Sequence, residues 1–251
     1  MNAAAWGVLL TVLLVGWVVL DGAVQGAGAT LLQERGPDGK DRRRDPARRH
    51  LVLGAVGPVL LPGEVWLVAA LGVLVGVFPH AEAELLGAGY PVALVLVGSW
   101  ALRDAAIWLR SRRPGNVWRD VWDVVLVVAS IALAGSWGAL LGVAWGSGLA
   151  ALALGIAAVV VTRLHGDALV AWRLRRTGPL PVAVTSVMIA APVVGTAIAA
   201  WPRLVGGAVS TEAMAALGIV ALVVLPLVLA LQVVAWWLVS RPLDRRDTLF
   251  F

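Results

Sequence analysis

The sequence predicts an all-α membrane protein, a polytopic bundle of about seven transmembrane helices. Of the 251 residues, 60% are hydrophobic and only 14% are charged. A soluble domain carries about 25% charged residues, because its surface must be wetted. Uncharged or nearly uncharged runs recur along the whole chain, and each has about the length that an α-helix needs to cross a hydrocarbon core of ~30 Å. We therefore expect residues 1–251 to form a single integral membrane domain.

Seven apolar runs define the predicted spans, and in chain order they cover residues 4–30, 51–78, 86–109, 121–146, 149–172, 182–200 and 213–238. The first run has no basic residue ahead of it and no hydrophilic mature chain behind a small-residue cleavage site. It is therefore expected to be a retained helix and not a signal peptide. The sequence Gly146-Ser147-Gly148 predicts a turn between the fourth and fifth runs, which would otherwise form one overlong helix.

Basic residues gather in alternate connections between the spans, and this asymmetry predicts the orientation. The loop of about residues 31–50, the connections after 109 and 172 and the C-terminal tail are all rich in arginine. The opposite connections contain acidic residues and a single basic one, Arg203. Because cytoplasmic loops carry the excess of Lys and Arg, we expect the N-terminus outside and the C-terminus in the cytoplasm, which requires an odd number of spans. The +5 net charge is thus a topology signal, and no nucleic-acid partner is expected.

Ionisable residues within the predicted spans are the candidate functional residues, because a charge at the bilayer centre costs roughly 2.5–3.5 kcal/mol on insertion scales. Glu64 lies close to mid-membrane, about 20 Å into its span at a helical rise of ~1.5 Å per residue. The remaining candidates fall in the cytoplasmic third of their spans, where they are expected to form one polar layer: Asp21, Arg103, Asp104, Arg163, His165 and Asp167.

Two interpretations of Glu64 stay open from the residues alone. In the functional one, Glu64 relays protons or contacts a quinone or an ion, because a desolvated carboxyl can exchange protons near neutrality. In the structural one, its carboxyl satisfies backbone groups that Pro62 and Gly63 leave free. The polar layer has a structural interpretation too, since arginines near helix ends reach the interface and neutralise acids on neighbouring helices.

The histidine and cysteine content indicates that this chain holds no haem or metal of its own. There is no cysteine, and of the three histidines only His165 lies within a predicted span, while His50 and His80 lie at span edges. A single intramembrane histidine cannot supply a bis-His haem site. The sequence also contains no P-loop, no metal-spaced cluster and no nucleophile motif.

A motif rich in glycine and proline lies in the second predicted span. It reads Gly57-Pro58-Val59-Leu60-Leu61-Pro62-Gly63-Glu64-Val65-Trp66-Leu67 and is followed by Phe78-Pro79. It resembles the signature of subunit II of cytochrome bd-type quinol oxidases, which reads Gly-Pro-Val-Trp-Asp-Gly-Asn-Glu-Val-Trp-Leu and then Ala-Phe-Pro. The matching signature residues include Gly57, Pro58, Glu64 and Trp66.

Three further stretches are similar to the same family in the same order: Leu20-Asp21-Gly22 with Gly26, the arginine pair Arg103 and Arg110, and Leu164-His165-Gly166. The resemblance spans roughly the first 180 residues. The chain departs from the family at the Trp-Asp pair, which is Leu60-Leu61 here, at the Asn, which is Gly63, and at the second acid of the first helix, which is Val24. The lost aspartate is associated with proton delivery in the family, so such a route here is absent or uses Glu64 alone.

The resemblance implies a haem-free, non-catalytic subunit of a quinol:oxygen oxidoreductase in a prokaryotic plasma membrane. It would pack beside a larger subunit I that carries haems b and d, in a complex that oxidises quinol and reduces dioxygen to water with cytoplasmic protons. This chain would supply helix surface, a groove for a structural quinone or lipid, and part of a proton or oxygen path. Family members generally have eight helices in two four-helix bundles, so the last one is expected to be absent here.

Two alternatives to this function stay open. One is a small proton-coupled transporter that uses Glu64 and Asp21 as its relay, although the sequence shows neither an internal repeat nor the paired broken helices of such proteins. The other is a divergent subunit II relative that has lost the proton path and only scaffolds its partner. A haem-bearing membrane subunit that co-purifies with this chain would favour the oxidase over the transporter.

Overall fold

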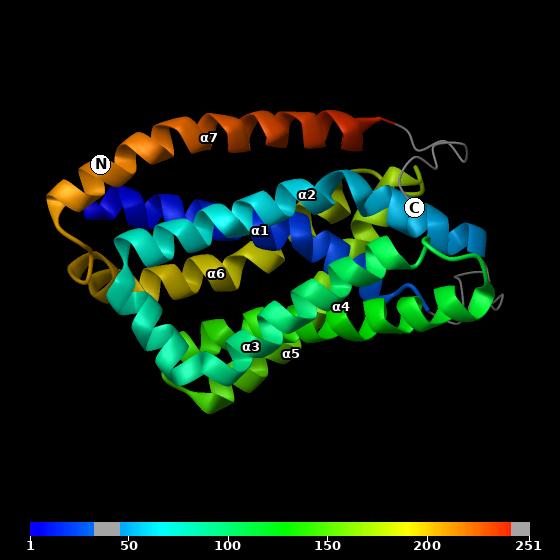
Figure 1. The fold of residues 1–251 in the computed structure, drawn as a ribbon, viewed down its shortest axis with the longest axis horizontal. Coiled ribbons are helices and arrows are strands. Elements are labelled where there is room, and N and C mark those ends of the chain that lie inside the picture. The colour runs from blue at the N-terminus through cyan, green and yellow to red at the C-terminus, as the bar shows by residue number, and fades with distance from the viewer. Residues whose placement is uncertain (33–45, 242–251) are drawn as a thin grey trace.

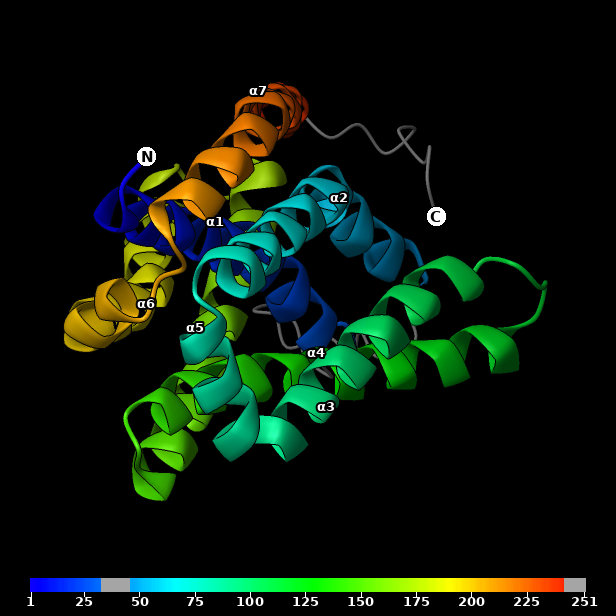
Figure 2. The same ribbon diagram turned by 60° about the vertical axis from the view of Figure 1, so that its left-hand side comes forward.

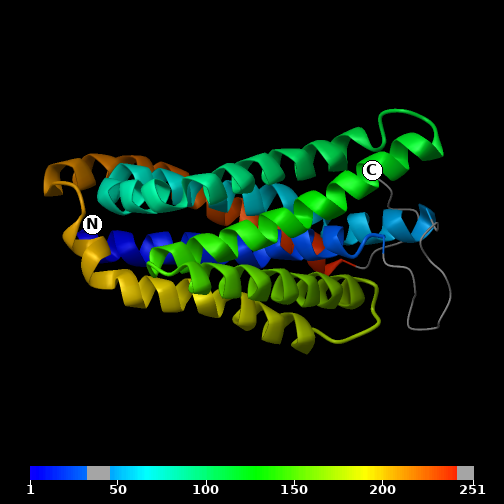
Figure 3. The same cartoon turned by 90° about the horizontal axis from the view of Figure 1, so that it is seen from below.

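The computed structural model describes residues 1–32 and 46–241 (Figure 1). These residues form seven α-helices and no strand: α1 (Ala3–Ala29), α2 (Pro46–Val77), α3 (Pro79–Leu109), α4 (Asn116–Ala144), α5 (Gly148–Arg173), α6 (Leu180–Gly206) and α7 (Thr211–Ser240). Each of the seven is long and apolar enough to cross a membrane, which confirms the predicted all-α class and the number of spans. Figure 3 shows the helices running back and forth along the long axis, as in a multi-pass membrane protein.

The helices extend beyond the predicted apolar runs. α2 begins at Pro46, so residues 46–50 of the loop predicted over 31–50 are helical. α3 begins at Pro79 and not near residue 86, because a proline suits the first turn of a helix, and Phe78 alone separates it from α2. α6 continues to Gly206 and includes Arg203. The apolar runs mark the part of each helix that suits hydrocarbon, whereas the helical ends carry polar side chains.

The described basic residues of the alternate connections lie at one end of the bundle. Arg49 of α2 and Arg110, directly after α3, both pair with Asp123 near the start of α4. At the end of α5, Arg173 donates hydrogen bonds from Nη1 to the carbonyls of Leu238 and Val239 near the end of α7, at 2.9 and 2.5 Å. The starts of α2 and α4 and the ends of α3, α5 and α7 lie at one end of the bundle (Figure 3), so these arginines share that end.

Several residues of the predicted basic loop and tail lie outside the described residues: Arg35, Lys40, Arg42, Arg43, Arg44, Arg245, Arg246 and Phe251. The end of the bundle opposite the basic one contains the N-terminus and three short connections, which are Phe78, residues 145–147 and residues 207–210. Which end faces the cytoplasm stays a prediction.

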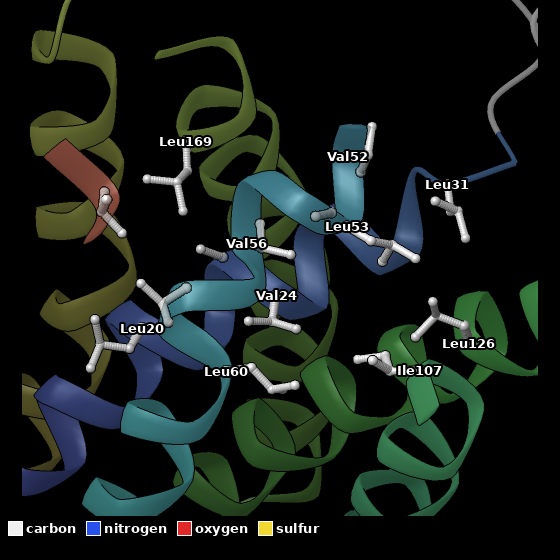
Figure 4. Close-up of a cluster of buried hydrophobic side chains, with 14 of the residues drawn as sticks. Leu20, Val24, Leu31, Val52, Leu53, Val56, Leu60, Ile107, Leu126 and Leu169 are labelled. Carbon is white, nitrogen blue, oxygen red and sulfur yellow. The ribbon is translucent and has the colours of Figure 1, made fainter. Parts of the chain in front are cut away.

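α1 is the central helix of the fold. It packs against α2, α4, α5 and α6, and the part from Leu20 to Gly28 is buried without interruption. Figure 4 shows the apolar cluster that surrounds this half of α1, with Val56 and Leu60 from α2 facing Val24. α7 lies along the outside and packs chiefly against α2 (Figures 1 and 2).

The backbones of α1 and α5 touch where two glycines meet. A Cβ atom on Gly26 would overlap the carbonyl oxygen of Thr162, and one on Gly166 would overlap the backbone of Gly26 and Ala27. Small residues at such crossings let membrane helices approach closely. This crossing brings His165 of α5 beside α1, where its ring contacts the carbonyl of Val19, two residues before Asp21.

Candidate functional site

A cluster of charged side chains lies between α1, α2 and α3, with Arg103 of α3 at its centre. The guanidinium is 0% exposed, and its Nη1 donates a hydrogen bond to Oδ1 of Asp21, which is 1% exposed. Its Nε donates to Oδ1 of Asp104 at 2.8 Å. Its Nη2 lies 2.8 Å from that same oxygen and 3.8 Å from Oε1 of Glu64. We call these four residues the Arg103 cluster.

A second set of hydrogen bonds holds the Asp21 carboxylate from the α1 side. Its Oδ2 accepts a hydrogen bond of 2.7 Å from Nε2 of Gln25, one helical turn further along α1. The amide oxygen of Gln25 accepts in turn from the indole Nε1 of Trp137 in α4, at 3.1 Å. Both oxygens of Asp21 therefore accept a hydrogen bond from a buried donor, and the cluster connects α3 through α1 to α4.

Glu64 reaches the Arg103 cluster because α2 comes close to α1 at the preceding residue. A Cβ atom on Gly63 would lie 3.2 Å from Cβ of Asp21, so a residue without a side chain fits best there. Glu64 and Asp104 are neighbours, because both carboxyls lie against Nη2 of Arg103. Leu61, at the place of the family's aspartate, is 59% exposed on the outer surface of α2 and stands apart from this group.

The other predicted site residues lie outside the Arg103 cluster, so the single polar layer that we expected is divided. The ring of His165 joins three helices: Nε2 donates to the carbonyl of Val19 in α1 at 2.9 Å, and Nδ1 lies 2.8 Å from the hydroxyl of Thr185 in α6. Asp167 lies near Thr30, the residue directly after α1. The basic side chains of Arg48 and Arg163 lie near Asp167.

A second ionic group at the basic end was missed by the sequence analysis. Asp123 of α4 is 0% exposed; its Oδ2 lies 2.7 Å from Nη1 of Arg49, and its Oδ1 lies 2.7 Å from Nε of Arg110. Arg49 also pairs with Asp120 at 2.7 Å. Arg49 falls in the basic loop predicted over 31–50 and Arg110 in the basic connection after residue 109, while Asp123 is not among the candidate residues. An aspartate placed between two arginine-rich segments was the available signal.

The signature residue Trp66, which follows Glu64 in α2, contacts two other helices. The indole Nε1 of Trp66 donates to Oε1 of Gln232 in α7 at 3.0 Å, and its ring lies against Gly16 of α1. Gln232 is a second residue that sequence reasoning missed, because only ionisable residues within the apolar runs were taken as candidates. Pro58 and Pro62 lie inside α2, which curves next to Val56 (Figure 4), as expected where proline removes a helical hydrogen bond.

The side chain of His165, the histidine predicted to lie within a span, does not fit the role of a haem ligand. Both ring nitrogens of His165 are engaged, by Val19 and Thr185. Across residues 1–32 and 46–241, no three His, Asp or Glu side chains converge as a metal site would need. With no cysteine in the sequence, thiolate ligation is not available either.

Comparisons with known proteins place the chain in a family. The family described as cytochrome bd terminal oxidase subunit II matches residues 2–173, which cover α1 to α5. Cytochrome bd-I ubiquinol oxidase subunit 2 of Escherichia coli (strain K12) is 27% identical over 125 residues, 50% of this chain and 31% of that protein. A probable cytochrome oxidase subunit 2 of Haemophilus influenzae is 32% identical over 119 residues, 47% of this chain and 29% of that protein. The chain thus matches about a third of the length of these curated relatives, and, with the family matched over most of its own length, it belongs to the cytochrome bd terminal oxidase subunit II family.

Proposed function

We propose that this chain is the haem-free subunit II of a cytochrome bd-type oxidase in a prokaryotic plasma membrane. The complex oxidises quinol, reduces dioxygen to water and takes the protons for water from the cytoplasm. The observation that carries the proposal is the Arg103 cluster. It joins Asp21, Glu64 and Arg103, which come from three separate family-like stretches of the sequence, within one group of hydrogen bonds and ion pairs.

The haems b and d belong, in this proposal, to a larger partner subunit. The support is the donor set of this chain, since the ring of His165 is already committed to Val19 and Thr185. The role of this chain is then to present helix surface to that partner and to hold polar groups at membrane depth. Arg103 and the Asp21 carboxylate fix the positions of those groups, and no electron passes through them.

The face between α2 and α3 is the surface that we assign to the partner subunit. The two helices join at Phe78 and then diverge (Figure 2), and the side chains of Glu64 and Asp104 are 23% and 22% exposed there. A carboxyl that faces hydrocarbon is costly, so such groups normally face protein or a water-filled space. A protein surface over this face removes that cost.

We also propose that the basic end of the bundle is cytoplasmic and that the N-terminus lies outside. Protons for oxygen reduction then approach from the end that carries Arg110 and Arg173. Glu64 and the rest of the Arg103 cluster are the proposed proton-carrying or proton-orienting groups, and His165 and Asp167 stand on the same half of the bundle as further candidates.

Purification of the tagged chain in mild detergent tests this proposal. The partners are identified by mass spectrometry, and the reduced-minus-oxidised spectrum is recorded on the same sample. We expect a larger integral-membrane subunit with b-type and d-type bands, and no Soret band from this chain expressed alone. A Soret band from the isolated chain would contradict the assignment of the haems, and purification without any haem-bearing partner would contradict the oxidase.

A further inference from the structure

The Arg103 cluster contains more acids than bases. Three carboxyls, those of Asp21, Glu64 and Asp104, face the one guanidinium of Arg103. With all of them ionised, three negative charges and one positive charge would leave two negative charges between helices. Carboxyls that share one site cannot all ionise, because each negative charge disfavours the next. The excess of negative charge therefore favours a proton on one of the three carboxyls.

Asp21 is poorly suited to hold that proton. Its two oxygens accept hydrogen bonds from Arg103 and from Gln25, and the Gln25 amide is oriented by the donor Nε1 of Trp137. A proton on Asp21 would weaken both of these bonds, because a neutral carboxyl is a poorer hydrogen-bond acceptor than a carboxylate. Asp21 therefore serves as the charge partner of Arg103.

The pair formed by Glu64 and Asp104 is better suited to hold the proton. Both carboxyls lie against the same nitrogen, Nη2 of Arg103, at 3.8 and 2.8 Å, and a proton on one of two neighbouring carboxyl groups allows it to donate a hydrogen bond to the other. The two groups also form the open edge of the cluster, at 23% and 22% exposure, whereas Asp21 is 1% exposed. A proton held by this pair is within reach of the α2–α3 face.

We propose that Glu64 and Asp104 hold one shared, exchangeable proton, and that Asp21 is only the fixed counter-ion of Arg103. Each exchange moves one proton and no electron: the pair takes it from a water or an acid on the α2–α3 face and returns it to a water or a base on that face. Asp104 then supplies, from α3, the second acid that α2 lacks at Leu61. The inference rests on the proposed function only in that an oxidase consumes protons.

Infrared spectroscopy of the detergent-purified protein with its native partners tests this inference, by following the carbonyl stretch of protonated carboxyls as water is replaced by D₂O. We expect an exchangeable band that disappears in both Glu64→Gln and Asp104→Asn. Either amide can donate to the remaining carboxylate, which then needs no proton. Glu84→Gln, which changes an exposed acid near the start of α3, is the matched control and keeps the band. Asp21→Asn keeps it too.

The single variants separate a shared proton from other arrangements. A band that survives Asp104→Asn but not Glu64→Gln places the proton on Glu64 alone and overturns the inference. A band lost only in Asp21→Asn, or in none of the variants, overturns it as well. If Glu64→Gln does not assemble, Asp104→Asn alone still distinguishes the two arrangements. A proton held by Glu64 alone would leave the infrared band in place in Asp104→Asn, whereas a shared proton would not. The infrared measurement does not depend on enzymatic turnover. If the oxidase proposal is wrong, that result appears separately, in the haem spectrum and in oxygen uptake.

Discussion

Arg103 of α3 and Asp21 of α1 form an ion pair in which neither side chain is more than 1% exposed. The two residues come from helices that are neighbours in space but are separated in the chain by the whole of α2. Because Arg103 belongs to α3 and Asp21 to α1, this pair fixes the relative position of the two helices beside Glu64. The stability of the bundle and the geometry of the candidate site therefore depend on the same residue.

Replacing Arg103 should destabilise the protein strongly. Arg103→Gln removes the cation and leaves a buried carboxylate without its charge partner, which costs about 3–5 kcal/mol where a buried pair is broken. Arg103→Lys should recover part of that loss, since lysine keeps the charge but not the planar fork that serves two carboxyls at once. The thermal unfolding midpoint in detergent measures both. Arg112→Gln, at an exposed position after α3, is the control, and an equal midpoint for Arg103→Gln and Arg112→Gln would contradict the role of the pair.

Replacing Glu64 by glutamine should lower quinol-dependent oxygen uptake by about an order of magnitude or more, with little loss of assembled complex. Glutamine preserves the shape of the side chain and its hydrogen bonds but cannot ionise, and a positioned proton-transfer group contributes ~10²–10⁴-fold to rate. Glu64→Leu separates the two interpretations: a structural role predicts poor assembly, whereas a proton role predicts an assembled, slow enzyme. Full activity of assembled Glu64→Gln would remove Glu64 from the mechanism and leave a scaffolding subunit.

Adding one methyl group at Gly26 should disrupt the crossing of α1 and α5. In Gly26→Ala the new Cβ overlaps the carbonyl oxygen of Thr162, and backbone cannot move aside as a flexible side chain can. Overpacking of this kind costs about 1–3 kcal/mol or more. Gly72→Ala is the matched control, because a Cβ on Gly72 has no atom within 4 Å. The yield of monodisperse protein after heating should fall for Gly26→Ala only; equal yields would show that the helices can separate without penalty.

Cysteine labelling in intact cells should establish the orientation, since the chain contains no native cysteine. Arg112→Cys lies in the α3–α4 connection at the basic end, and Ser210→Cys precedes α7 at the opposite end. An impermeant maleimide should label Ser210→Cys and not Arg112→Cys. The same protection is predicted for cysteines at Arg42, Arg44 and Phe251, outside the described residues. Labelling at position 112 with protection at 210 would reverse the orientation.

The sequence was sufficient for the number and order of the helices, because apolar length is a property of each segment alone. It was not sufficient for their ends. α3 begins with Pro79 and includes Glu82 and Glu84, which read as a polar connection, yet a helix can leave the hydrocarbon and continue among polar groups. Depth along each span could also be counted from the sequence. Glu64 and Asp21 were recognised as candidates for that reason.

The sequence did not predict which of the candidate residues contact one another. Rotation about the helix axis decides whether a side chain faces its neighbour or lipid, and that rotation depends on close contacts such as Gly63 against Asp21. His165, although its depth suggested the same layer, instead faces Val19 and Thr185. Gln25 went unnoticed because it is uncharged, although it occupies one of the two oxygens of Asp21.

The end of the bundle that contains Phe78 has a further consequence for how the protein meets its surroundings. Its connections consist of Phe78 alone, residues 145–147 and residues 207–210. Connections this short contain no extended segment that a protease could cleave. They also form no protruding loop that an antibody or a soluble electron carrier could bind. A protein that binds at that end would therefore contact the helix ends themselves.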